Sequence, residues 1–178
     1  MAEIEAPTEA IAEELHHQAH AARDQWVSQV ALSSAFLAVL AAIGALMANH
    51  HANEAMIEQI QASDQWGYYQ AKSIKAGLLG SKLEILNAMG KASVEKDQSK
   101  LSEYKHEQEE ISERAQEKEK NSLSHLKIHS VLARSVTFFQ IAIGIAAISV
   151  LAKRRKVWLL GMGFGFLGLV FLVQGFLS

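Results

Sequence analysis

Long apolar runs along this chain are separated by one extended polar stretch and one short basic loop. Three runs, at residues 27–48, 131–152 and 157–177, each reach the roughly 20 residues that a helix needs to cross the hydrocarbon core of a bilayer. Their residues do not alternate with period two, and an open sheet could not satisfy its backbone groups in lipid. The pattern therefore predicts three transmembrane helices over these residues.

The polar stretch at residues 49–130 keeps a helical rhythm on both sides of the turn-forming residues 90–93. Apolar residues recur there at three- and four-residue spacing, which is typical of coiled-coil interfaces. The outgoing row is Ile57, Ile60, Ala71, Ile74, Leu78 and Ile85, and the return row is Leu101, Tyr104, Gln108, Ile111 and Ala115. We predict an all-α membrane protein in which a long extramembrane antiparallel helical hairpin, with these rows in contact, joins the first two transmembrane helices.

Charge predicts the orientation of the chain. Residues 153–156 read Lys-Arg-Arg-Lys, and short loops with such an excess of cations are cytoplasmic. Residues 1–26 then form a cytoplasmic amphipathic helix, while the hairpin and the C-terminus are periplasmic. Because residues 1–26 are rich in Glu, they do not resemble a signal peptide, and the first apolar run is expected to stay as an anchor. The predicted location is a bacterial inner membrane, crossed several times.

Composition excludes several classes of function. The net charge is −2 at pH 7, which gives no electrostatic basis for binding nucleic acid. The chain has no cysteine, which rules out disulfides, thiol nucleophiles and thiolate ligands. No catalytic triad, phosphate loop or cofactor fingerprint is recognisable. We therefore expect no enzyme activity and no cofactor, apart from a divalent transition metal at one candidate site.

That candidate metal site lies where the two arms of the hairpin would meet the membrane. If the first two transmembrane helices end at the same height, His50 faces His129 and Glu54 faces His125. The two residues on each arm are four apart and share a helix face. Three imidazoles and a carboxylate suit zinc or a similar ion, although four polar residues in the headgroup zone are the simpler interpretation. A further group, interpreted as a solvated helix face, comprises Glu13, His16, His17, His20 and Asp24.

Polar and small residues within the apolar runs bear on assembly. Gln140 with Ser33 or Ser34 could line an oligomeric pore, whereas no acidic residue inside a run supports proton-coupled transport. Gly161 and Gly165 lie on one side of the third run, where small residues permit close helix packing. This packing can occur within the subunit or between subunits.

Two short motifs are distinctive: Asp-Gln-Trp at residues 24–26, after the acidic start, and Ser-Asp-Gln-Trp-Gly-Tyr-Tyr-Gln-Ala-Lys at residues 63–72. With these motifs the chain resembles, over nearly its whole length, a bacterial inner-membrane family catalogued as domain of unknown function 4337. The family has no established activity. The resemblance therefore implies a membrane protein and no particular chemistry.

Two functions from different classes fit these patterns. The first is a structural or accessory integral membrane protein whose helical stalk mediates self-association or docking to a larger membrane complex. Its partners are then the lipid bilayer and either further copies of the chain or other subunits. The alternative is an oligomeric channel or ion-binding transport component. We favour the first, because pore-forming proteins usually carry selectivity features that are not recognisable here.

Overall fold

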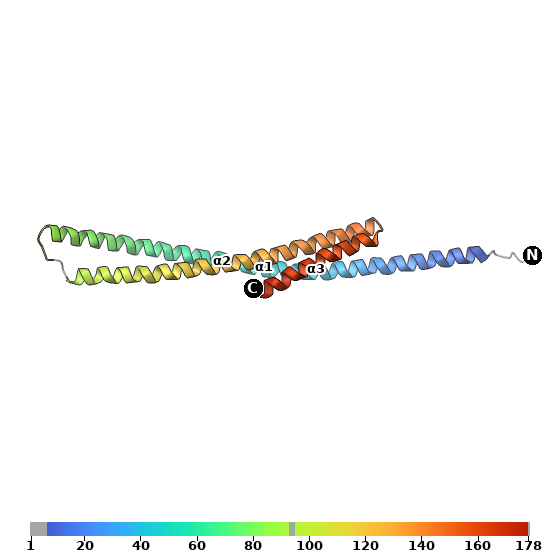
Figure 1. Ribbon diagram of the computed structural model, residues 1–178, viewed down its shortest axis with the longest axis horizontal. Coiled ribbons are helices and arrows are strands. Elements are labelled where there is room, and N and C mark those ends of the chain that lie inside the picture. The colour runs from blue at the N-terminus through green and yellow to red at the C-terminus, as the bar shows by residue number, and fades with distance from the viewer. Residues whose placement is uncertain (1–6, 93–94, 178) are drawn as a thin grey trace, which may run out of the picture. The chain divides into compact units, whose positions relative to one another are not determined.

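The computed structural model describes the backbone of residues 7–92 and 95–177, and the side chains from residue 25 onward within those ranges. Apart from two short connections these residues are helical, and none of them lies in a strand (Figure 1). The helices are α1 (Pro7–Ala88), α2 (Glu95–Leu151) and α3 (Arg155–Leu177). Each helix contains a segment long and apolar enough to cross a membrane. The prediction of an all-α chain with three such helices is therefore confirmed.

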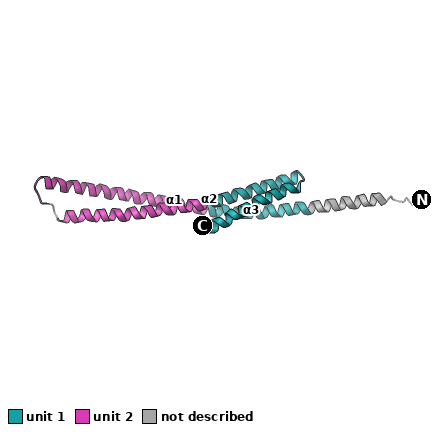
Figure 2. Cartoon of the chain, viewed as in Figure 1, with its two compact units in different colours: residues 1–48, 130–178 teal, residues 49–129 magenta. Residues whose placement is uncertain are grey.

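The chain divides into two compact units, shown in teal and magenta in Figure 2. The first unit contains residues 1–48 and 130–178, and the second contains residues 49–129. Helices α1 and α2 contribute residues to both units, whereas α3 belongs to the first alone. Each unit has its own set of internal contacts.

A row of glycines on α3 lies where this helix contacts the other two helices of the first unit. The residues of α3 that are buried recur at three- and four-residue spacing, so they share one face; they are Gly161, Gly165, Gly168, Leu172 and Gly175. A β-carbon added at Gly168 would lie 2.7 Å from Cδ1 of Phe139 on α2. One added at Gly165 would lie 3.0 Å from Cδ2 of Leu37 on α1. The glycines thus pack within the subunit and let α3 approach both other helices closely.

Aromatic side chains add to the contacts of the first unit. The ring of Phe138 stacks on that of Phe171, with centroids 5.4 Å apart, and lies 6.2 Å from that of Phe164. The indole Nε1 of Trp158 donates a hydrogen bond of 3.1 Å to the Ser33 hydroxyl. That hydroxyl in turn donates to the carbonyl oxygen of Val30 at 2.9 Å. These contacts tie α3 to α2 and to α1.

In the second unit, residues 49–88 of α1 (the outgoing arm) and residues 95–129 of α2 (the return arm) lie side by side in opposite directions (Figure 2). Small residues fill the contact between them; the buried ones are Ala55, Ala62, Ala76, Ala115 and Ser122. Because alanine projects so little, the two backbones lie close together. The Ser122 hydroxyl reaches across and donates a 2.8 Å hydrogen bond to the carbonyl oxygen of Ala55.

Ion pairs join the two arms along their length. Lys118 Nζ lies 3.1 Å from a carboxylate oxygen of Glu58. Nearer the connection between the arms, Lys82 Nζ lies 2.5 Å from a carboxylate oxygen of Asp97. A third pair, between Lys72 and Glu107, lies between these two along the outgoing arm. The outgoing residue numbers rise as the return numbers fall, which is the pairing expected of antiparallel helices.

The contact face of the outgoing arm differs from the predicted one. Ile74, Leu78 and Ile85 were expected to face the return arm, but they are 64%, 69% and 60% exposed. The prediction was wrong for this arm, because the alanines take the inner face in its place. On the return arm Ile111 is buried as predicted, together with Ala115.

The outgoing arm ends at the turn predicted for residues 90–93. Gly90 has a φ of 67°, in the left-handed region that favours glycine. The backbone N–H of Lys91 donates to the carbonyl of Leu86, and that of Gly90 to the carbonyl of Asn87, both at 3.0 Å. This pair of bonds satisfies carbonyls that the end of a helix otherwise leaves without partners.

Candidate functional site

A histidine pair joins the outgoing and return arms at one end of the second unit. Nδ1 of His51 lies 2.9 Å from Nδ1 of His125, with ring centroids 5.2 Å apart. The ring of His50 lies 5.5 Å from that of His51. A neutral imidazole has one N–H, so one ring of the pair donates through Nδ1 and the other accepts there. Protonating the accepting ring would place two N–H groups against each other and break the bond.

The surroundings of His51 lower its pKa below the ordinary value of 6.5. Partial burial is the largest cause, followed by the neighbouring rings of His125 and His50. His129 acts in the same direction, while the carboxylate of Glu54 opposes the shift. These surroundings therefore favour the neutral form of the His51 ring.

The structure shows His125, one of the four predicted metal ligands, in a contact other than the expected one with Glu54. His125 is brought to His51, the neighbour that the prediction left out, and His50 lies on an exposed part of the helix. Among the described side chains, no group of three or more His, Asp or Glu residues is arranged to hold a metal ion. A site made of His50, Glu54, His125 and His129 stays a prediction. The side chains of the other group, on residues 13–24, lie outside the described residues.

Acidification is expected to loosen the contact between His51 and His125. Because the folded-state pKa of His51 lies below 6.5, its contribution to stability is present above that pH and lost as the pH falls through the lowered value. As the pH is lowered from about 7.5 to about 5.5, the rate of amide hydrogen exchange at residues 49–55 and 122–129, corrected for intrinsic rates, should increase. The variant His51→Gln should show a smaller rise. An equal rise in both proteins would contradict the assignment.

A second cluster crosses between the arms at the motif of residues 63–72. The indole Nε1 of Trp66 donates a 2.8 Å hydrogen bond to a carboxylate oxygen of Glu119. Lys72 pairs with Glu107, and its Nζ lies 5.0 Å from the ring centroid of Tyr104. The hydrogen bond to Glu107 is the main reason that the pKa of Lys72 is raised.

The sequence alone did not reveal these cross-arm contacts. Their only signal was the unusual density of aromatic and charged residues in the motif. The distinctive residues of the motif thus join the two arms.

A third feature is an exposed apolar surface on the outgoing arm, which we call the outer apolar row; it comprises Ile57, Ile60, Ile74, Leu78 and Ile85. Leu78 follows the buried Ala76 by two residues, and Ile57 follows Ala55 in the same way. Two residues correspond to about 200° around an α-helix. The outer apolar row therefore lies on the side of the outgoing arm that faces away from the return arm.

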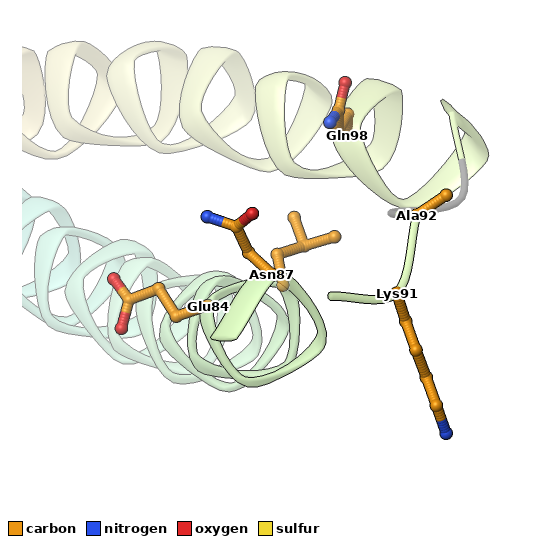
Figure 3. A pocket seen from close by; sticks show the side chains of 6 residues that line it. Glu84, Asn87, Lys91, Ala92 and Gln98 are labelled. Atoms are coloured by element: carbon orange, nitrogen blue, oxygen red, sulfur yellow. The ribbon is translucent and has the colours of Figure 1, made fainter. Parts of the chain in front are cut away.

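Hollows on the second unit are open to solvent and lined by both polar and apolar side chains. One lies beside the connection between the arms and is lined by Glu84 and Asn87 of the outgoing arm and by Gln98 of the return arm (Figure 3). Another lies between Lys82, Asp97 and their neighbours. Neither gathers the nucleophile, base and oxyanion donors that a hydrolytic or transfer reaction requires.

These features define a class of protein: an all-helical chain with three helices able to cross a membrane and a paired-helix unit with an exposed apolar row. The sequence profile of the family described as Domain of unknown function (DUF4337) matches residues 26–178. The chain therefore belongs to this family, as its motifs suggested. Searches of curated proteins and of solved structures gave no match.

Proposed function

We propose that this protein is a non-catalytic accessory protein of a bacterial inner membrane. Residues 27–48, 131–152 and 157–177 anchor it in the bilayer. The second unit stands outside the bilayer as a helical stalk and docks onto another membrane-anchored chain. The observation that carries this proposal is the outer apolar row, five exposed apolar side chains on one face of the outgoing arm, interrupted by Asp64 and Gly67.

The asymmetry of the stalk supports a docking role. Isolated exposed apolar side chains are normal, whereas a contiguous apolar surface marks an interaction site. Ile74 and Leu78 lie one helical turn apart on the outgoing arm and are both exposed. On the return arm, by contrast, the exposed side chains between residues 105 and 120 are largely charged; they include Lys105, Glu109, Glu113, Glu117 and Lys120. Between residues 105 and 120 the return arm thus presents a charged surface, whereas its exposed leucines, Leu123 and Leu126, lie further along toward its C-terminal end.

The basic loop supports a cytoplasmic position for residues 153–156. Lys153 has a φ of 54°, in the left-handed region, where a β-carbon costs roughly 1 kcal/mol or more. Glycine is the usual residue at such a helix end. With lysine at residue 153, residues 153–156 form four consecutive cations. The positive-inside rule relates such an excess of cations to a cytoplasmic position.

The channel alternative has less support. Ser33, one of its candidate pore residues, is engaged with Trp158 and with the carbonyl of Val30. Gln140 is exposed on the outside of the first unit. An oligomeric pore would draw its ion ligands from several subunits, and the Ser33 hydroxyl is already engaged within its own.

Labelling with a membrane-impermeant thiol reagent tests the proposed anchoring. The chain has no native cysteine, so Ser99→Cys and Lys156→Cys each create one reactive site. In right-side-out membranes, Ser99→Cys should react at once and Lys156→Cys only after permeabilisation. Labelling of Lys156→Cys from outside would overturn the orientation. Protection of Ser99→Cys from both sides would overturn the stalk.

A further inference from the structure

We propose that the partner of the stalk is a second copy of this chain: two outgoing arms pair in parallel and in register through their outer apolar rows. This inference rests on the proposed function, because it requires the stalk to stand outside the bilayer. It adds the identity of the partner and the geometry of the contact.

The spacing of the outer apolar row fits a coiled coil. From Ile57, steps of three and four residues reach Ile60, Ile74, Leu78 and Ile85. Every position of this series between residues 57 and 88 is exposed. The row therefore follows a heptad pattern in which the first and fourth positions face a partner helix. Four small residues, Gly67, Ala71, Ser81 and Ala88, occupy further positions of the series.

The membrane anchor makes a second copy the natural occupant of this surface. Copies inserted in the same bilayer have the same orientation, and their stalks begin at the same height. Two outgoing arms then run parallel, and each residue of the outer apolar row meets its own counterpart across a two-fold axis. Such an interface is isologous and closes as a dimer. A different protein would need a matching heptad at the same height above the membrane.

Flanking charges permit this pairing. In a parallel coiled coil, a residue just before the first heptad position approaches the residue five further along on the partner. Here Gln70 would approach Lys75, Gly77 would approach Lys82, and the last such pair is Glu84 with Met89. None of these pairs brings like charges together. An arrangement that placed like charges opposite each other would destabilise the pairing by several kcal/mol.

The return arms border one edge of the contact, where Asp64 and Leu78 line open hollows together with return-arm residues. Each otherwise lies on the opposite side of its outgoing arm, against Ala62 and Ala76. A pair of stalks thus forms four helices with the charged return arms outside. The heptad core and its flanks supply roughly 20 residues from each copy, the lower end of the 20–30 residues a side in standard interfaces.

One residue of the heptad series opposes the pairing. Asp64 occupies a first position, so two carboxylates would meet across the axis. A single polar residue at such a position fixes register and weakens the coiled coil. The inference therefore predicts that Asp64→Leu strengthens the dimer, an effect that a solvated, unpartnered helix would not show.

Disulfide formation in native membranes tests the pairing. With the full chain, Ile60→Cys and Ile74→Cys should each form a disulfide-linked dimer under mild oxidation, because parallel pairing places identical core residues opposite each other. Glu113→Cys, on the exposed face of the return arm, should stay monomeric. A tagged Ile60→Cys chain should form no mixed disulfide with Ile74→Cys, because these positions lie about 21 Å apart along a helix.

A matched pair of double variants then tests the energetic role of the row. In the Ile60→Cys background, Ile74→Gln with Leu78→Gln should lower the disulfide-linked fraction at least about tenfold. Glu113→Gln with Glu117→Gln, which places the same residues at the same spacing on the return arm, should leave that fraction unchanged. Asp64→Leu should raise it.

The outcomes separate the two proposals. If Ser99→Cys is labelled as expected but neither Ile60→Cys nor Ile74→Cys forms a dimer, self-pairing is wrong and the anchored stalk stands. A mixed disulfide between positions 60 and 74 would overturn the parallel register. If Ile74→Cys crosslinks to a different protein in place of itself, docking stands and the second copy is excluded.

Discussion

Replacing Gly168 with valine is expected to destabilise the packing of α3 by about 3 kcal/mol or more. An added β-carbon alone would lie 2.7 Å from Cδ1 and 2.8 Å from Cε1 of Phe139. The ring of Phe139 is fully buried, so it has no free space into which to move. Overpacking a close-packed interior typically costs about 1–3 kcal/mol, and a branched side chain against a rigid ring lies at the upper end.

Gly163 provides the matched control for this substitution. It lies on the same apolar helix, α3, and a β-carbon there would meet nothing within 4 Å. Gly163→Val should therefore leave stability unchanged or raise it slightly, because glycine disfavours helix. Unfolding of the full chain in mixed micelles, followed by circular dichroism, measures both. Equal losses for the two variants would contradict the assigned packing.

Replacing Ala62 with leucine is expected to separate the two arms of the second unit, at a loss of about 2–3 kcal/mol. Ala62 has no exposed surface and lies in the row of small residues between the arms. The hydrogen bond of 2.8 Å from the Ser122 side chain to the Ala55 carbonyl shows how closely the arms approach. A leucine at residue 62 has no room in that contact without moving the return arm.

Ala71 gives the control on the same helix. It lies in the exposed heptad series, so Ala71→Leu should not disturb the contact between the arms. Hydrogen exchange of the full chain should rise across residues 49–129 for Ala62→Leu and stay unchanged or fall for Ala71→Leu. The disulfide assay described above should report a stronger dimer for Ala71→Leu. Faster exchange in both variants would indicate that the inner and outer faces have been assigned wrongly.

Helical class and the three apolar segments could be predicted from sequence because both depend on local physics. The hydrocarbon thickness of a bilayer sets the length of a spanning helix, and the segments around residues 27–48, 131–152 and 157–177 meet that length without help from the rest of the chain. The turn near Gly90 was predictable for a similar reason. A left-handed backbone conformation favours glycine wherever it occurs.

The choice of inner and outer faces was not local. The outgoing arm carries two rows with helical spacing, one of alanines that includes Ala55 and Ala62 and one of larger residues such as Ile74 and Leu78. Sequence reasoning favoured the larger residues, because hydrophobicity usually marks the buried face. Contacts of Trp66 and Lys72 with the return arm require the alanine face to point inward.

The histidines and the glycine row illustrate the same limit. Residues 51 and 54 point about 60° apart on a helix, so a modest rotation of α1 decides whether His125 meets Glu54, as predicted, or His51. In the structure the ring of His51 makes that contact. The glycines of α3 predicted close packing without naming a partner, and the buried ring of Phe139 beside Gly168 places the contact within the subunit. Sequence by itself determined which segments are helical and apolar, because residue type and spacing suffice for that. Only the tertiary structure decided which faces meet, because that depends on how all contacting side chains fit at once.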